Sequence, residues 1–157
     1  MIRLVLPDVL DAMRLVDIGR AAADHGDYPW NVFDYITRGA LPGAIVLADV
    51  AVQFGFISLQ CAADESEILN IATIPAARGR GLGQLLLSEG ERLSAQNGAR
   101  RIFLEVAADN APALRLYEKA RYTQVGERKA YYKRPDGSRM DAFVLAKDLA
   151  PPSGQNH

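Results

Sequence analysis

A short segment rich in glycine and arginine is the part of the sequence best suited to bind a ligand. It reads Arg78-Gly79-Arg80-Gly81-Leu82-Gly83 and lies just before an amphipathic stretch. Such a turn leads into a helix whose first N–H groups are unpaired and whose dipole is positive, which suits a phosphate group. Arg78 and Arg80 add two guanidinium groups that match a pyrophosphate. The alternative is a plain turn with solvated arginines.

The spacing of the glycines distinguishes three kinds of phosphate-binding loop. A Walker loop needs Lys and then Ser or Thr after its last glycine, but Gly83 is followed by Gln84. A dinucleotide-binding loop that starts at Gly79 needs glycine where the chain has Gln84. The pattern that remains is Arg-x-x-Gly-x-Gly, formed by Arg78, Gly81 and Gly83.

The expected secondary structure places this loop inside a mixed α/β fold. We expect strands where short apolar runs are bounded by turn residues, and helices where apolar residues recur every three or four positions. The expected strands are 2–6, 44–48, 51–61, 67–74, 101–107 and two that flank 135–138, and the expected helices are 8–20, 32–38, 81–98 and 110–120. The order is β-α-α-β-β-β-α-β-α-β-β. It predicts a mixed, mostly antiparallel central sheet with helices on both faces and one parallel pair around the glycine-rich loop.

Length and composition predict a single globular domain. The 157 residues are enough to bury a sizeable core, and we expect one domain over 1–149 with a disordered tail over 150–157. No run of about 18 apolar residues could span a membrane. The apolar stretch at the N-terminus is too short for a signal peptide, so we expect a cytoplasmic protein.

Charge and the scarcity of histidine and cysteine limit the chemistry. The net charge of −1 gives no basic surface for nucleic acid. The chain has two histidines, His25 and His157, and one cysteine, Cys61, so we expect neither a metal site nor a Cys-His pair, and a Ser-His-carboxylate triad would depend on His25. Any acid or base is therefore expected to be a carboxylate, a tyrosine or water.

The loop motif and its surroundings resemble the GNAT superfamily of acetyltransferases, whose pyrophosphate signature is Arg-x-x-Gly-x-Gly. Within it, the chain is most similar to the RimI group, the bacterial ribosomal-protein-alanine acetyltransferases. The shared segments are Asn70-Ile71-Ala72, Leu104-Glu105-Val106, Asn110, Leu116-Tyr117-Glu118, Tyr131-Tyr132, Asp136-Gly137, Asp141-Ala142 and Pro29-Trp30. One departure is Arg121, which stands where the family has glycine. We expect the preceding helix to end differently there, at some cost in strain.

The resemblance implies that acetyl-CoA donates an acetyl group to an amine. Glu105 lies in an apolar strand, where desolvation favours the protonated carboxyl and suits a general base near neutral pH. The group has its base at this position; the alternative is a structural carboxylate paired with an arginine. The resemblance makes Tyr117 the general acid, whereas its place on the apolar face of a helix also fits a core residue.

Further contacts follow from the same resemblance. The residues expected to bind acetyl-CoA are Ile71, Ala72, Thr73, Arg78, Gly79, Arg80, Gly81, Leu82, Gly83, Gln84, Asn110 and Tyr117. Asn110 is also suited to cap its helix. Trp30, Tyr131 and Tyr132 are expected to contact the acceptor, and the alternatives are a core role for Trp30 and ordinary sheet aromatics for the tyrosines. Because neighbouring residues of a strand point to opposite faces, only one of the two tyrosines would line a given cleft.

These observations lead to one expectation with two alternatives. We expect direct transfer of the acetyl group to the N-terminal alanine of a small-subunit ribosomal protein, by a monomer or weak dimer that binds neither nucleic acid nor membrane. The first alternative is acetylation of a small-molecule amine. The second is a non-catalytic acyl-CoA-binding module.

Overall fold

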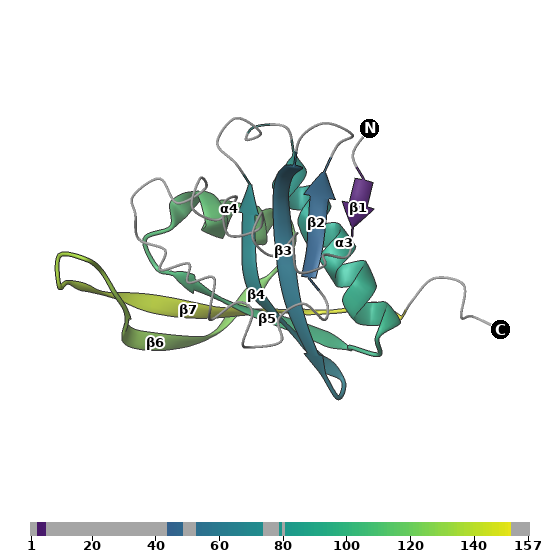
Figure 1. The fold of residues 1–157 in the computed structure, drawn as a ribbon. Helices are drawn as coiled ribbons and strands as arrows, with labels where there is room; N and C mark the ends of the chain where they lie inside the picture. Colours follow the sequence, from purple (N-terminus) through teal and green to yellow (C-terminus); the bar gives the residue numbers. More distant parts are fainter. Residues whose placement is uncertain (1–2, 6–43, 49–52, 74–78, 80, 152–157) are drawn as a thin grey trace. The chain divides into compact units, whose positions relative to one another are not determined.

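The computed structural model describes residues 3–5, 44–48, 53–73, 79 and 81–151 (Figure 1). The expected helices over 8–20 and 32–38 lie outside the described residues. So do Trp30, Arg78, Arg80 and most of the expected tail. Within the described part of the chain, no helix is long and apolar enough to cross a membrane.

The chain divides into two compact units. The first comprises Met1–Gln60 and Leu69–Leu93, and the second comprises Cys61–Ile68 and Ser94–His157.

The first unit contains an antiparallel set of strands and most of one helix. Strand β1 (Arg3–Val5) pairs with β2 (Ala44–Ala48), and β2 pairs with β3 (Gln53–Ala62), both antiparallel. Helix α3 (Leu82–Gln96) lies close to β3, because a Cβ on Gly90 would be only 2.7 Å from Cδ1 of the buried Ile57. A glycine inside a helix normally weakens it, and here it permits the close approach.

The second unit is built on four strands in the order β4-β5-β7-β6. The first half of β4 (Glu65–Thr73) runs parallel to β5 (Arg101–Ala107), as the strand-helix-strand pattern predicted. Strand β7 (Arg139–Asp148) is antiparallel to β5 and to β6 (Thr123–Lys133), and β6 and β7 form the long hairpin in Figure 1. Helix α4 (Ala111–Lys119) connects β5 to β6.

The side chains of β5 alternate between two environments. Ile102, Leu104 and Val106 are buried and form part of the core, whereas Phe103, Glu105 and Ala107 are only partly buried on the other face. This period of two is the normal consequence of a pleated strand. It places Glu105 on the partly exposed face of the sheet, away from the apolar side chains beside it in the sequence.

Candidate active site

The parallel pairing of β4 and β5 places two carboxylates on one face of the sheet. Glu67 of β4 pairs with Phe103 of β5, and Glu105 follows Phe103 by two residues. Because residues two apart in a strand share a face, Glu67 and Glu105 are diagonal neighbours. Glu105 was expected from the sequence, and Glu67 was not. The signal that could have found Glu67 is its position between the buried Ser66 and Ile68, once the parallel register is known.

Glu105 forms an ion pair with an arginine of the hairpin. Nε of Arg128 donates a hydrogen bond to Oε1 of Glu105 at 2.7 Å, with 57% of the arginine side chain and 21% of the glutamate side chain exposed. The expected alternative, a carboxylate paired with an arginine, is therefore observed. A structural partner and a catalytic role are compatible, and the role of Glu105 as a base stays a prediction.

The Glu67 carboxyl has a raised pKa. Burial, and then the negative charge of Glu105, raise the pKa of the Glu67 carboxyl above its ordinary value, against the opposing effect of Arg128. A nearby like charge disfavours ionisation, so the charge of Glu105 favours the protonated form of Glu67.

Tyr131 completes the cluster. The negative charge of Glu105, together with a hydrogen bond between the two side chains, raises the pKa of the Tyr131 phenol. The guanidinium carbon of Arg128 lies 5.5 Å from the centre of the Tyr131 ring. The structure therefore brings together two residues predicted from the sequence, Glu105 and Tyr131, and adds Arg128 and Glu67. We call these four residues the acidic cluster.

The prediction that Tyr131 and Tyr132 point to opposite faces is wrong. Their ring centres are 5.2 Å apart and the rings meet edge to face. The physical reason is a break in the register of β6 between Arg128 and Tyr132, where Ala130 has a φ of +48°. A bulge cancels the alternation on which the prediction depended.

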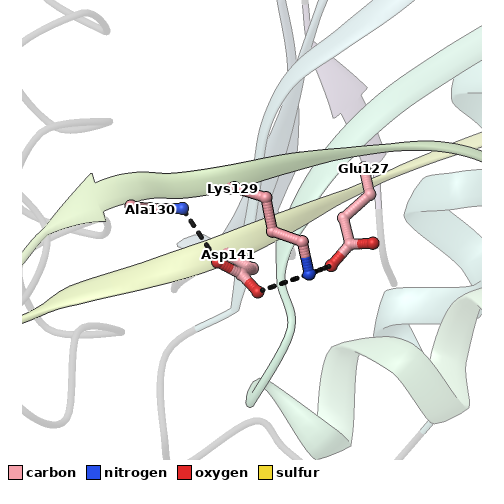
Figure 2. A network of polar contacts seen from close by, with 4 residues as sticks. All are labelled: Glu127, Lys129, Ala130 and Asp141. Atoms are coloured by element: carbon pink, nitrogen blue, oxygen red, sulfur yellow. Dashed lines mark hydrogen bonds and ion pairs between the residues drawn. The ribbon is translucent and has the colours of Figure 1, made fainter.

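Asp141 of β7 binds the bulge (Figure 2). Its Oδ1 accepts a hydrogen bond from the Ala130 backbone N–H at 2.8 Å, and its Oδ2 lies 3.4 Å from Nζ of Lys129. Lys129 also pairs with Glu127 at 2.8 Å. The hydrogen bond from Ala130 and the charge of Lys129 lower the pKa of the Asp141 carboxyl. Asp141 is therefore negatively charged at neutral pH.

Tyr117 is buried in α4, with only 4% of its surface exposed. Its ring contacts that of Tyr122, with 5.7 Å between the ring centres. The expectation of an apolar environment is confirmed, while the role of Tyr117 as an acid stays a prediction.

The start of α4 agrees with the expectation. Oδ1 of Asn110 accepts a hydrogen bond from the Ala113 N–H at 3.3 Å, and a proline lies in the first turn. Asn110 is therefore the N-cap. Its contact with acetyl-CoA stays a prediction.

The end of α4 differs from the expectation. Arg121 has a φ of +71°, the Tyr122 N–H bonds to the Tyr117 carbonyl at 2.9 Å, and the Arg121 N–H bonds to that of Glu118 at 3.0 Å. These bonds make a Schellman motif, the usual end of a helix with glycine at this position. The prediction that the helix ends differently is wrong, because Arg121 itself adopts the left-handed conformation. The expected strain follows from that conformation.

The glycine-rich loop enters α3 through two left-handed glycines. Gly79 and Gly81 have φ values of +80° and +75°, and a Cβ at either would meet nothing within 4 Å. The Leu85 N–H bonds to the Gly81 carbonyl at 3.1 Å, and the helix continues through Leu82, Gly83 and Gln84. An open backbone and the N-terminus of a 15-residue helix fit a phosphate-bearing cofactor such as acetyl-CoA. Ile71, Ala72 and Thr73 lie in β4, as expected. Among the described residues, no group of three or more His, Cys, Asp or Glu side chains could hold a metal ion.

Comparison with known proteins gives a consistent set of relatives. The ribosomal protein bS18-alanine N-acetyltransferase of Haemophilus influenzae is 39% identical over 92 residues, which cover 59% of this chain and 62% of that protein. The crystal structure of the ribosomal-protein-S18-alanine N-acetyltransferase from Escherichia coli matches with a TM-score of 0.83 at 26% identity. That match covers 100% of this chain and 99% of the other.

A third match has the same fold with a different acceptor. A GNAT superfamily phosphinothricin acetyltransferase from Sinorhizobium meliloti, solved in complex with acetyl-CoA, has a TM-score of 0.79 at 18% identity, covering 99% of this chain and 92% of that one. The fold alone therefore does not determine the acceptor.

The sequence match to the family extends over most of the chain. The sequence profile described as the acetyltransferase (GNAT) family matches residues 17–121, more than half of the chain. The matched part of the sequence spans somewhat less than two thirds of the curated relatives. The resemblance stated from the sequence is confirmed, and the described strands and helices are those of the GNAT fold. The chain belongs to the GNAT family of acetyltransferases.

Proposed function

We propose that this protein transfers an acetyl group from acetyl-CoA to the N-terminal α-amine of a protein in the cytoplasm. The acceptor is the N-terminal alanine of a small-subunit ribosomal protein. Membership of the GNAT family supports the reaction, and the names of the relatives from Haemophilus influenzae and Escherichia coli support this acceptor.

The observation that carries the proposal is the acidic cluster. Glu105 forms an ion pair with Arg128, its charge raises the pKa of the nearby Tyr131 phenol, and Glu67 lies beside it on the same face. A pair of carboxylates attracts an ammonium group, and an α-amine has a pKa of roughly 8, against about 10.4 for a lysine side chain. Near neutral pH, an α-amine therefore loses its proton to a carboxylate more readily than a lysine side chain does.

The roles of the residues follow from the chemistry that acetyl transfer requires. Glu105 takes up the proton of the amine, directly or through water, and Tyr117 donates a proton to the departing thiolate. Transfer is direct, and no residue of the chain carries the acetyl group. Tyr131, with Tyr132 and Trp30, contacts the acceptor.

The other sequence-predicted contacts hold the donor. When bound, acetyl-CoA supplies the activated acetyl group. The backbone of Ile71, Ala72 and Thr73 contacts its pantetheine arm. The N–H groups from Gly79 to Gln84, with Arg78 and Arg80, bind its pyrophosphate, and Asn110 adds a further contact.

An acceptor comparison tests the proposal. The protein is incubated with acetyl-CoA and either a peptide that starts with alanine or a panel of polyamines, amino acids and aminoglycosides. The proposal expects acetylation of the peptide, and acetylation of small amines alone would overturn it. Transfer to no acceptor would favour a non-catalytic acyl-CoA-binding module.

A tyrosine variant tests the proposed acid. Tyr117→Phe keeps the buried ring and removes the hydroxyl, so we expect kcat to fall by about 100-fold with the fold intact. Tyr122→Phe changes the ring that contacts Tyr117 and is the matched control, with kcat close to that of the wild type. Equal rates for wild type and Tyr117→Phe would remove Tyr117 as the acid.

A further inference from the structure

The β6–β7 hairpin contains a bulge larger than the common single-residue type. Arg128 pairs with Ala142, and the next pair is Tyr132 with Met140. Three residues of β6 therefore lie opposite one residue of β7, Asp141. Regular pairing would place one residue there, so the bulge inserts two.

The bulge is strained and depends on bonds from β7. Ala130 has a φ of +48°, which a residue with a Cβ adopts only when its surroundings fix it. Asp141 accepts the Ala130 N–H at 2.8 Å, and Nη1 of Arg139 donates to the Ala130 carbonyl at 3.3 Å. Figure 2 shows the Asp141 carboxylate between the Ala130 N–H and the Lys129 ammonium group.

The bulge also changes where Tyr131 points. In a regular strand, Tyr131 and Tyr132 would lie on opposite faces. With the bulge, the centres of the two rings lie 5.2 Å apart, and Tyr131 lies near enough to Glu105 for the charge of that carboxylate to raise the pKa of the phenol. The phenol nonetheless belongs to a residue that is 48% exposed, so it remains open to a ligand from solvent.

We propose that Asp141 is a positioning residue, which holds the bulge of β6 and thereby directs Tyr131 to the acceptor side of Glu105. This inference rests on the proposed function in one respect, namely that the acceptor binds beside Glu105. Asp141 touches neither substrate and acts through Ala130 and Tyr131. Its loss therefore affects acceptor binding and spares the binding of acetyl-CoA.

Steady-state kinetics test the proposal. Asp141→Ala removes the acceptor for the Ala130 N–H, and we expect the KM for an alanine-initiated peptide to rise roughly tenfold or more, with the KM for acetyl-CoA unchanged. Asp141→Asn keeps an oxygen for that N–H, so it is expected to restore most of the affinity. Lys129→Ala removes the two ion pairs and leaves the bulge bond, and it is the matched control with near wild-type values.

A double-mutant cycle separates positioning from general destabilisation. If Asp141 acts through Tyr131, Asp141→Ala has no further effect on the acceptor KM in a Tyr131→Ala background. Additive effects of the two substitutions would overturn the proposal. Equal losses for both substrates in Asp141→Ala would overturn it as well.

A titration of Tyr131 tests the inference without any acceptor. The ultraviolet titration of the wild type minus that of Tyr131→Phe isolates the Tyr131 phenol, whose pKa is raised by Glu105. We expect Asp141→Ala to lower that pKa toward its ordinary value and Asp141→Asn to preserve it. An unchanged pKa in Asp141→Ala would overturn the inference. A lowered pKa in a protein that acetylates no peptide would support the positioning role and contradict the proposed acceptor.

Discussion

Nε of Arg128 lies 2.7 Å from Oε1 of Glu105, although the two residues are 23 positions apart in the sequence. The pair joins β6 to β5 across the intervening strand β7, since Glu105 pairs with Val144 and Arg128 pairs with Ala142. Glu105 is thus a fixed side chain on the partly exposed face of the sheet. This geometry links the proposed base to the hairpin proposed to bind the acceptor.

Replacing Glu105 tests its role as a base. Glu105→Gln keeps the size of the side chain and one oxygen that can accept the Arg128 hydrogen bond, and it removes the basicity, so we expect kcat to fall about 100-fold or more. Arg101→Gln is the control. It removes the ion pair between Arg101 of β5 and Asp148, whose Nε and Oδ1 atoms lie 3.5 Å apart, and it should leave the rate nearly unchanged. A Glu105→Gln enzyme as fast as the wild type would exclude Glu105 as the base.

Replacing Glu67 tests whether burial and the charge of Glu105 disfavour the ionised Glu67 carboxylate, and the free energy of unfolding measures the effect. A raised pKa means that folding favours the protonated Glu67 carboxyl. The stability that the protonated Glu67 carboxyl contributes is fully present below its ordinary pKa of 4.5. It is lost as the pH rises through the raised pKa of the folded state. Glu67→Gln should therefore be more stable than the wild type at pH 7, by less than about 1 kcal/mol because the site is exposed to solvent.

Urea unfolding at several pH values measures this difference. We expect it to disappear at acidic pH, where the wild-type carboxyl is protonated. Glu65→Gln, at an exposed position two residues earlier in β4, is the matched control for the loss of one carboxylate from this strand. Lower stability of Glu67→Gln at pH 7 would show that the charged carboxylate is favourable.

Asn110 allows its two expected roles to be separated. Asn110→Ala removes the acceptor for the Ala113 N–H and should lower the free energy of unfolding by about 1 kcal/mol. Asn110→Ser retains a capping oxygen and should keep that stability. If Asn110 also contacts acetyl-CoA, the serine variant raises the KM for acetyl-CoA without loss of stability. A serine variant with wild-type KM would restrict Asn110 to capping.

Replacing Arg121 by glycine is expected to stabilise the protein. Glycine adopts the left-handed φ of this position without strain, so Arg121→Gly should raise the free energy of unfolding by about 1 kcal/mol. Arg115→Gly, at an exposed position in the middle of the same helix, should lower it by about 1 kcal/mol. Chemical denaturation measures both, and a destabilised Arg121→Gly would mean that the arginine side chain makes a favourable contact.

Local patterns were sufficient to predict several features from the sequence. The strands at Ala44–Ala48 and Arg101–Ala107 have the predicted bounds, because each is a short apolar run beside turn residues. Asn110 caps its helix as expected, since the cap depends on residues only three positions apart.

Features set by long-range contacts were not predicted. The bulge beside Tyr131 depends on a bond between Ala130 and Asp141, which are 11 positions apart, and no local pattern encodes it. Glu67 was missed because its place beside Glu105 depends on the register of two parallel strands. Arg121 shows a different limit, since the local hydrogen bonds that end α4 hold it in a left-handed conformation that its residue type disfavours.

The central claim is acetyl transfer to the α-amine of an N-terminal alanine, and tandem mass spectrometry of a reacted peptide tests it most directly. The peptide starts with alanine and carries one internal lysine, so that the two amines compete in one molecule. We expect a single acetyl group on the α-amine, formed at least about 100-fold more slowly by the Glu105→Gln variant. Acetylation of the lysine instead, or of neither amine while a small-molecule amine is acetylated, would contradict the account.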